Sequence, residues 1–362
     1  AYLTYPNGAS LLFTCRLIKN RNMADEANET SESESVVDPA MVTLIGKVNS
    51  LHEECIKIRQ STSDAGELNL LEKAEAKCKM CLQLLETGQA AAGKKAVLFK
   101  VLQHYSQALL DETYVLECRL VNADFPEDRC KGDIKHLIGT AIFFWIKFFF
   151  QGWLLKNNGS SNKDWGEVSS CQLDQPEELV KEMLGSEYKS GQILGSDILE
   201  CLFWRRGALF YMYCHTLFND PQRRKLDTTH IRQCAESGVK YLEAMLCVRS
   251  PLMMDAMTDV SAKNEDMMQL LKEGIFSDTH LLALMYSGEL CYWHWKIVKE
   301  TTTDQSVKES SDADENCSGN FNSVSNGRRL LQKFVNIVQD CFKGRGWDCS
   351  RAEQILAEFP EC

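Results

Sequence analysis

Two segments that share one layout constrain the fold of this chain more than any other feature. Both open with Ser-Asp and continue as dense apolar and aromatic runs, at Ser196–Leu217 and Ser277–Trp295. Each carries a glycine at the same distance from its start, Gly207 and Gly288. A serine or aspartate before such a run is typical of a helix N-cap. A glycine inside a helix costs about 1 kcal/mol relative to alanine, so it usually marks close approach of a neighbouring backbone. The layout therefore predicts two capped core helices.

Apolar residues three and four positions apart predict helices along most of the remaining chain. Within residues 39–60 the expected apolar stripe consists of Val42, Ile45, Val48, Leu51, Cys55 and Ile58. The other helices are expected at 68–86, 95–120, 176–184, 228–248, 264–272, 328–342 and 350–359. Strand signals are nearly absent. The fold class is therefore predicted as all-α, an irregular helical bundle or a short helical-repeat-like array of about eight to ten helices.

Composition changes along the chain predict its organisation. The first 22 residues read as sequence upstream of a start at Met23, and an acidic arm follows them. The expected parts are a lead-in with the acidic arm (1–38), N-terminal helices (39–136), an apolar then polar insertion (137–175), a central core with both signature helices (176–300), an acidic linker (301–326) and a C-terminal helical pair (327–362).

The charge and cysteine content exclude two classes of protein. The formal net charge of −11 comes from two segments, because residues 23–38 carry −6 and residues 300–326 carry −5. Nothing in the balanced remainder supplies the basic face that binds nucleic acid. The 16 cysteines are scattered over a long chain and many lie in apolar helical runs. This pattern is typical of small buried hydrophobes in a cytosolic protein and not of a disulfide scaffold.

One apolar stretch, residues 137–155, is long enough to cross a bilayer. Lys147 lies at its middle and Gln151 follows, and both are costly in hydrocarbon. The alternatives are a membrane anchor, a membrane-surface or buried segment, and a non-native insertion such as a translated intron. The last is favoured, so no stable membrane insertion is expected.

Motifs that could carry chemistry are incomplete. Residues 88–95 (GQAAAGKK) nearly spell a phosphate-binding loop, but they lack the Ser or Thr that follows the lysine. Cys78 and Cys81 have the spacing of half a zinc site without a second pair at a matching distance. The expectation is therefore no catalytic, cofactor-binding or metal-binding residue, no cofactor, and no enzyme activity.

Arg206 is a charge at a core position of the first signature helix. Such a charge must be paired or must face a partner. One hypothesis is a buried ion pair between Arg206 and Glu289 of the second signature helix, with Asp111 and Glu112 as further candidate partners. The alternative is that Arg205 and Arg206 bind an acidic partner segment.

Aromatic residues crowd the ends of both signature helices. Tyr211 lies on the first, and Tyr292, Trp293 and Trp295 lie on the second. Aromatic stripes at helical spacing are usually core, but Trp293 and Trp295 do not easily share one helix face. These four residues, with Arg205 and Arg206, are therefore the candidates for partner binding.

The signature segments resemble a known family, the Rab-seven-interacting subunit of the Mon-one/Ccz-one complex. The resemblance rests on DILECLFWRRGALFYMYCHTL from Asp197 and GIFSDTHLLALMYSGELCYW from Gly274, and more weakly on LLDETYVLECRLVNADFPED from Leu109 and the terminal AEQILAEF. Residues 1–22 and the stretch after Ile138 depart from the family pattern. The resemblance supplies no catalytic residues and no mapped interface.

The resemblance implies a cytosolic, non-catalytic helical adaptor. It would bind the Mon-one/Ccz-one exchange complex and the late-endosomal Rab GTPase, and support that Rab's stability and recruitment in mitophagy and autophagy. Recruitment to late endosomes or damaged mitochondria is implied as well. Two other hypotheses stay open: a generic helical scaffold of another cytosolic assembly, and a membrane-anchored protein that uses residues 137–155.

Overall fold

The computed structural model of the chain describes residues 3–4, 10–11, 39–88, 94–125, 175–185, 188–226, 228–249, 276–305 and 321–360. These residues form eleven helices, which confirms the all-α fold class. Two short strands, β1 (Leu3–Thr4) and β2 (Ser10–Leu11), pair antiparallel with Leu3 opposite Leu11. The acidic arm before Pro39, the helix expected at 264–272 and most of the expected insertion lie outside the described residues.

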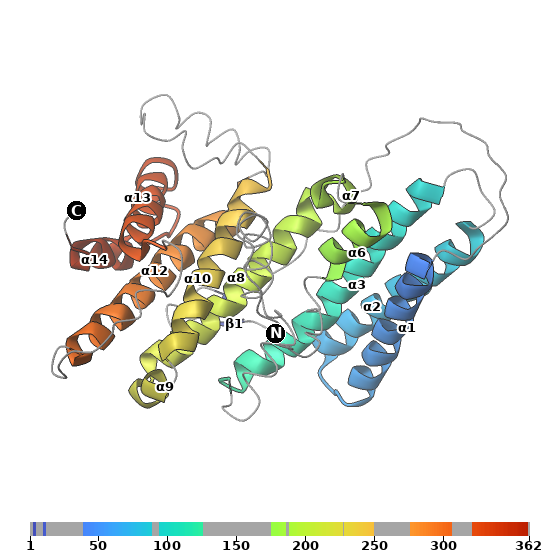
Figure 1. Cartoon of the computed structure of the whole chain (residues 1–362), viewed down its shortest axis with the longest axis horizontal. Coiled ribbons are helices and arrows are strands. Elements are labelled where there is room, and N and C mark those ends of the chain that lie inside the picture. The colour runs from blue at the N-terminus through green and yellow to red at the C-terminus, as the bar shows by residue number, and fades with distance from the viewer. Residues whose placement is uncertain are drawn as a thin grey trace, which may run out of the picture. The chain divides into compact units, whose positions relative to one another are not determined.

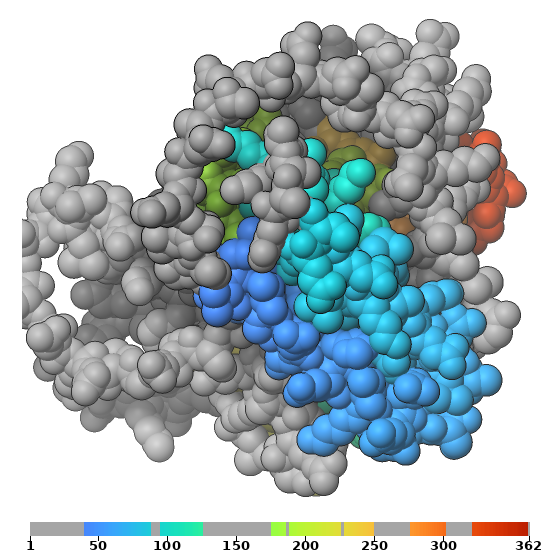
Figure 2. Space-filling model, turned by 90° about the vertical axis from the view of Figure 1, so that its right-hand side faces the viewer, coloured from blue at the N-terminus to red at the C-terminus, as the bar shows by residue number. Residues whose placement is uncertain are grey.

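The chain divides into two compact units, Ala1–Glu112 and Thr113–Cys362. The first contains α1 (Pro39–Gln60), α2 (Ala65–Gly88) and the first part of α3 (Lys94–Asn122). Figure 2 shows α1 and α2, in blue, at the surface that faces the viewer. The two helices are linked by an ion pair of 2.5 Å between Arg59 Nε and Glu75 Oε1.

The apolar stripe of α1 differs from the predicted one in its first turn. Val48, Leu51, Cys55 and Ile58 are buried as expected, but Val42 is 55% exposed and Leu44 is fully buried in its place. Val42 lies three residues before Ile45 and Leu44 lies four residues before Val48. Periodicity alone therefore could not choose between Val42 and Leu44.

The second unit contains the remaining helices, which are α6 (Gln175–Leu184), α7 (Ser190–Leu194), α8 (Ser196–Asn219), α9 (Pro221–Leu226), α10 (Thr228–Cys247), α12 (Asp278–Gln305), α13 (Ser323–Cys341) and α14 (Ser350–Glu358). Four of them, α8, α10, α12 and α13, pack side by side (Figure 1). The two signature segments form α8 and α12, and both lie in the core. At the expected linker, α12 continues to Gln305 and α13 begins at Ser323, while residues 306–320 lie outside the described part of the chain.

Glycines set how closely these four helices approach. A Cβ added to Gly207 of α8 would lie 2.5 Å from Cγ of Leu242 on α10, and one added to Gly288 of α12 would overlap Leu331 of α13. In the same way, a Cβ added to Gly238 of α10 would overlap Leu290 of α12. Each of these three glycines thus faces a leucine of a neighbouring helix. The predicted backbone neighbour is found at Gly207, where the added Cβ would lie 3.3 Å from the carbonyl oxygen of Gly238. At Gly288 the nearest atoms belong to the Leu331 side chain, so the close neighbour there is a side chain and not a backbone.

The predicted serine cap of α8 is wrong, whereas Ser277 directly precedes α12 as predicted but uses its side chain differently. The helix α8 begins at Ser196 itself, and its N-cap residue is Gly195, whose φ of 85° turns the chain out of α7. Before α12, the Ser277 hydroxyl contacts Nδ1 of His280 at 3.0 Å, and the backbone N–H of Ser277 donates to the same ring nitrogen at 3.2 Å. A histidine ring therefore takes part in the cap, which the Ser-Asp pattern does not reveal.

No helix in the described residues is both long and apolar enough to cross a membrane. The apolar stretch 137–155 lies outside them.

Candidate functional site

Arg206 is enclosed by the fold of the second unit and is 1% exposed. Its Nη1 lies 2.9 Å from Oε2 of Glu177 on α6, and its guanidinium lies 5.1 Å from the ring centroid of Tyr241 on α10. The predicted pairing with Glu289 is therefore wrong in its partner. The reason is positional, because α6 brings a carboxylate to Arg206, whereas Glu289 is engaged by Tyr211 and Arg351.

Arg205 is buried on another side of α8. Its Nη2 lies 2.5 Å from Oε1 of Glu117 on α3 and donates to the Thr113 hydroxyl at 3.2 Å. Burial raises the pKa of Glu117, and the charge of Arg205 opposes this shift. Ion pairing within the fold thus accounts for both arginines that the sequence singled out.

Tyr211 and Glu289 join the two signature helices. The Tyr211 hydroxyl donates to Oε2 of Glu289 at 2.6 Å, and Nε of Arg351 on α14 donates to Oε1 at 3.0 Å. Tyr211 also stacks on Tyr286 with 3.7 Å between ring centroids, and it lies 5.2 Å from Trp293. Tyr211 and Trp293 are 5% and 2% exposed, so both belong to the core between α8 and α12.

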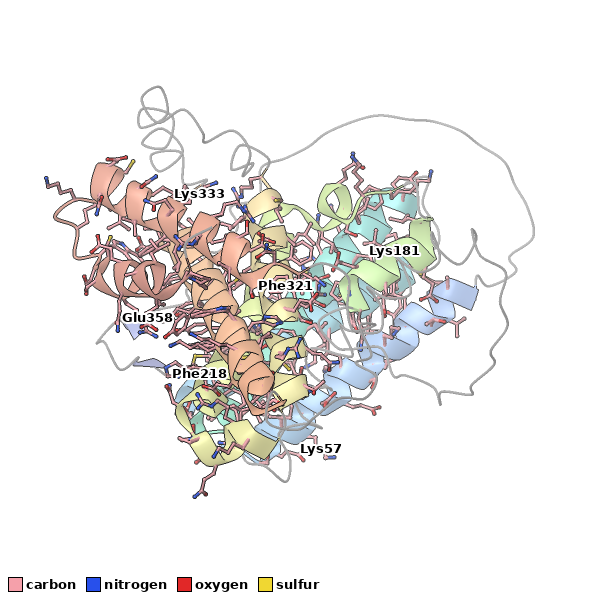
Figure 3. All side chains as sticks on the ribbon, turned by 60° about the vertical axis from the view of Figure 1, so that its left-hand side comes forward. Lys57, Lys181, Phe218, Phe321, Lys333 and Glu358 are labelled. Carbon is pink, nitrogen blue, oxygen red and sulfur yellow. The ribbon has the colours of Figure 1, made fainter. Side chains whose placement is uncertain are left out.

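Four aromatic rings form a continuous row from the end of α8 across α12 to α14. Tyr292 lies 6.4 Å from Phe218, 6.1 Å from Trp295 and 6.1 Å from Phe359, and the centroids of Trp295 and Phe359 are 5.5 Å apart. Tyr292 and Phe359 are buried, whereas Phe218 and Trp295 are partly exposed. Figure 3 labels Phe218 at the end of α8 and Glu358 at the end of α14.

Cations lie over these rings. Arg224 is 4.9 Å from the Phe218 centroid, and Lys299 is 5.3 Å from that of Trp295. Lys296 lies over Tyr292 and Trp295, and Arg351 lies over Tyr292. Such contacts are favourable because the ring face is electronegative. We call this surface the aromatic–basic strip, and it consists of Phe218, Arg224, Tyr292, Trp295, Lys296, Lys299, Arg351 and Phe359.

Ion pairs hold the strip in place. Lys296 lies 2.8 Å from Glu358, and Arg224 lies 3.5 Å from Glu300. The Tyr292 hydroxyl donates to Glu358 at 2.7 Å. The hydrogen bond with Glu358 raises the pKa of Lys296, and the hydrogen bonds from Lys296 and Tyr292 lower the pKa of Glu358. Lys296 and Glu358 therefore stay charged at neutral pH. Burial raises the pKa of Tyr292, so its hydroxyl keeps its proton.

Sequence reasoning found Tyr292 and Trp295 but missed the rest of the strip. Lys296 and Lys299 each follow an aromatic residue at a spacing of four, which places them on the same helix face. That signal was present in the sequence. No local pattern could have found Phe359 or Arg351, because tertiary packing alone brings α14 to α12.

The cysteine pair of the sequence serves packing, whereas residues 89–93 of the GQAAAGKK motif lie outside the described residues. Cys78 and Cys81 are fully buried on α2, and burial raises the pKa of the Cys78 thiol to about 12. The Cys81 thiol contacts the backbone carbonyl of Val101 at 3.5 Å. Within the described ranges, no group of three or more His, Cys, Asp or Glu side chains could hold a metal ion.

The described fold is that of an all-helical protein, and the aromatic–basic strip on α8, α9, α12 and α14 is its candidate protein-binding face. A family model described as RAB7A-interacting MON1-CCZ1 complex subunit 1 matches residues 76–143 and 140–360. A relative with that name from Homo sapiens is 34% identical to this chain, and the alignment covers 72% of this chain and 77% of the relative. One from Danio rerio is 31% identical, over 87% of this chain and 96% of the relative. The chain belongs to this family, which confirms the resemblance of the signature segments. No solved structure matches it.

Proposed function

We propose that this chain is a non-catalytic adaptor that associates with the MON1–CCZ1 complex and with RAB7A. The observation that carries the proposal is its membership of a family whose curated relatives bear that association in their names and align with most of the chain. The fold is compatible with the proposal, because Arg205, Arg206 and Glu289, three charged side chains buried in the second unit, form ion pairs or hydrogen bonds that join helices.

Co-purification tests this association. The tagged full-length chain, expressed in cells of its own organism, is expected to retain both MON1 and CCZ1 and, with them, RAB7A. An unrelated helical protein with the same tag serves as the control. Failure to retain MON1 and CCZ1, under conditions in which these two proteins retain each other, would falsify the proposal and favour a scaffold of another assembly.

The finer part of the proposal concerns what the association achieves. A cytosolic adaptor recruited to late endosomes or damaged mitochondria would support the stability and recruitment of RAB7A in mitophagy and autophagy. Removal of the chain is then expected to lower both the cellular amount of RAB7A and its fraction on damaged mitochondria, and re-expression is expected to restore both. Unchanged amount and location after removal would refute this role while leaving the association intact.

Membrane anchoring through residues 137–155 is the competing hypothesis for localisation. Carbonate extraction of the full chain and of a variant lacking residues 140–172 separates the two. The adaptor hypothesis predicts that both are extracted. Resistance of the full chain that disappears in the variant would overturn the cytosolic assignment.

A further inference from the structure

We propose that the aromatic–basic strip binds an acidic protein segment that carries at least one apolar side chain. This inference rests on the proposed function, because it assigns the partner chemistry of an adaptor surface. The strip draws on four helices, α8, α9, α12 and α14. It holds Trp295, the partly exposed member of the six residues expected to bind a partner.

Exposure distinguishes the strip from the buried aromatic core beside it. Tyr292 and Phe359 form its floor and are 6% and 3% exposed, while Trp295 and Phe218 keep part of their rings accessible. Tryptophan is enriched among the residues that dominate binding energies, because it covers a large apolar area with few rotatable bonds. An apolar side chain of a partner can therefore pack on Trp295.

The charges of the strip favour an acidic partner. Arg351 is 40% exposed as a side chain, whereas the carboxylate with which it pairs, on Glu289, is 9% exposed and lies beneath the surface. The positive end of that pair is thus the one that faces outward. Lys299 is exposed beside Trp295 as well. Carboxylates of a partner can therefore pair with Arg351 beside Tyr292 and with Lys299 beside Trp295. Such charge complementarity sets specificity and association rate.

The same charges argue against a lipid surface as the occupant. Glu300 and Glu358 pair with cations of the strip and are 51% and 34% exposed as side chains. Exposed carboxylates repel anionic headgroups. A protein segment can avoid these two carboxylates, whereas a membrane presents negative charge across the whole strip.

The experiment compares full-length variants in capture of the MON1–CCZ1 complex. Trp295→Ala, and separately Lys296→Glu combined with Lys299→Glu, are expected to lower the amount captured by at least about tenfold. The matched control is Lys343→Glu combined with Arg345→Glu, on the exposed turn between α13 and α14, where Arg345 lies 5.5 Å from the Phe342 ring. This control reverses the same number of charges in the same unit and is expected to capture the complex normally.

A second measurement tests the chemistry of the partner segment without the MON1–CCZ1 complex. A fluorescent peptide of alternating Glu, Asp, Leu and Phe is titrated with the full chain, beside a peptide with Lys in place of every acid. Binding of the acidic peptide is expected to weaken in both strip variants and with added salt. Circular dichroism of all variants checks that each remains folded.

The outcomes separate the strip from the function. If the strip variants capture the complex as well as the wild type does, the strip inference is wrong and the proposed function stands. If the wild type captures no complex, the proposed function fails, and the peptide titration alone tests the strip inference. Peptide binding that requires both the acidic residues and Trp295 supports the inference, and the absence of such binding overturns it. Co-sedimentation with phosphatidylserine vesicles that is lost in the strip variants, with capture unchanged, would instead assign the strip to a membrane.

Discussion

The Tyr211 hydroxyl donates a 2.6 Å hydrogen bond to Glu289 and so links α8 to α12, the two helices that the sequence marked by a common layout. Arg351 of α14 donates to the other oxygen of the same carboxylate. One buried acid therefore joins three helices. Because a buried carboxylate that loses a donor keeps its desolvation cost, this site makes a sharp prediction about stability.

Replacement of Tyr211 by Phe is expected to lower the free energy of unfolding by about 1–3 kcal/mol, because it removes a hydrogen bond to a buried charge. Tyr292→Phe is the matched control, since its acceptor, Glu358, is exposed and can bind water instead. Urea denaturation should show the smaller loss for Tyr292→Phe. Equal losses would mean that Glu289 does not depend on its tyrosine.

The glycine contacts predict opposite effects for the same substitution at two sites. Gly288→Ala forces a methyl group into Leu331 and is expected to destabilise the protein by about 1–3 kcal/mol. Gly46→Ala on α1 meets no atom within 4 Å and is expected to stabilise it by up to about 1 kcal/mol through helix propensity. Thermal unfolding compares the two. A neutral Gly288→Ala would show that α12 and α13 separate easily.

Arg206→Met tests whether this arginine serves packing or partner binding. Its partner Glu177 is partly exposed and can rehydrate, so the expected loss of stability is about 1–3 kcal/mol, below that of a fully buried pair. Arg329→Met is the control, because its pair with Glu243 lies at the surface and contributes at most about 1 kcal/mol. Capture of the complex should be normal in both. A folded Arg206→Met protein that captures no complex would contradict the packing role.

His294 predicts a pH dependence of stability. Burial, with a smaller effect from Arg232, lowers the pKa of His294 from 6.5 to about 4. The unfolded chain thus binds a proton near pH 6.5 that the folded protein takes up only near pH 4, so stability present above pH 6.5 is lost as the pH falls toward 4. Each pKa unit corresponds to about 1.4 kcal/mol, so His294 alone should cost about 2 kcal/mol between pH 8 and pH 5.

Comparison with His294→Gln isolates this contribution from those of the acids. Urea denaturation at pH 8 and pH 5 should show a smaller loss of stability in the variant than in the wild type, by about 2 kcal/mol. If the stability of the two proteins falls equally between pH 8 and pH 5, the fold tolerates charged His294 at no cost, and the prediction is refuted.

The helices could be read from sequence because they depend on local periodicity, capping and glycine. The predicted helix at 39–60 coincides with α1, and the one at 350–359 differs from α14 by a single residue. The partners of the charged residues could not be read in this way. Nothing near Arg206 in the sequence indicates Glu177, and the choice between Glu177 and Glu289 depends on where α6 packs.

The sequence by itself determined that this protein is all-α, that the two signature segments are core helices with close neighbours at Gly207 and Gly288, and that it resembles the family to which it belongs. Only the tertiary structure decided which of the six predicted partner-binding residues stay accessible. It buries Arg205, Arg206, Tyr211, Tyr292 and Trp293 and leaves Trp295 partly exposed. The physical reason is that the exposure of a side chain depends on the helices that pack over it. The packing of α14 against α12 is a tertiary contact between segments far apart in the sequence.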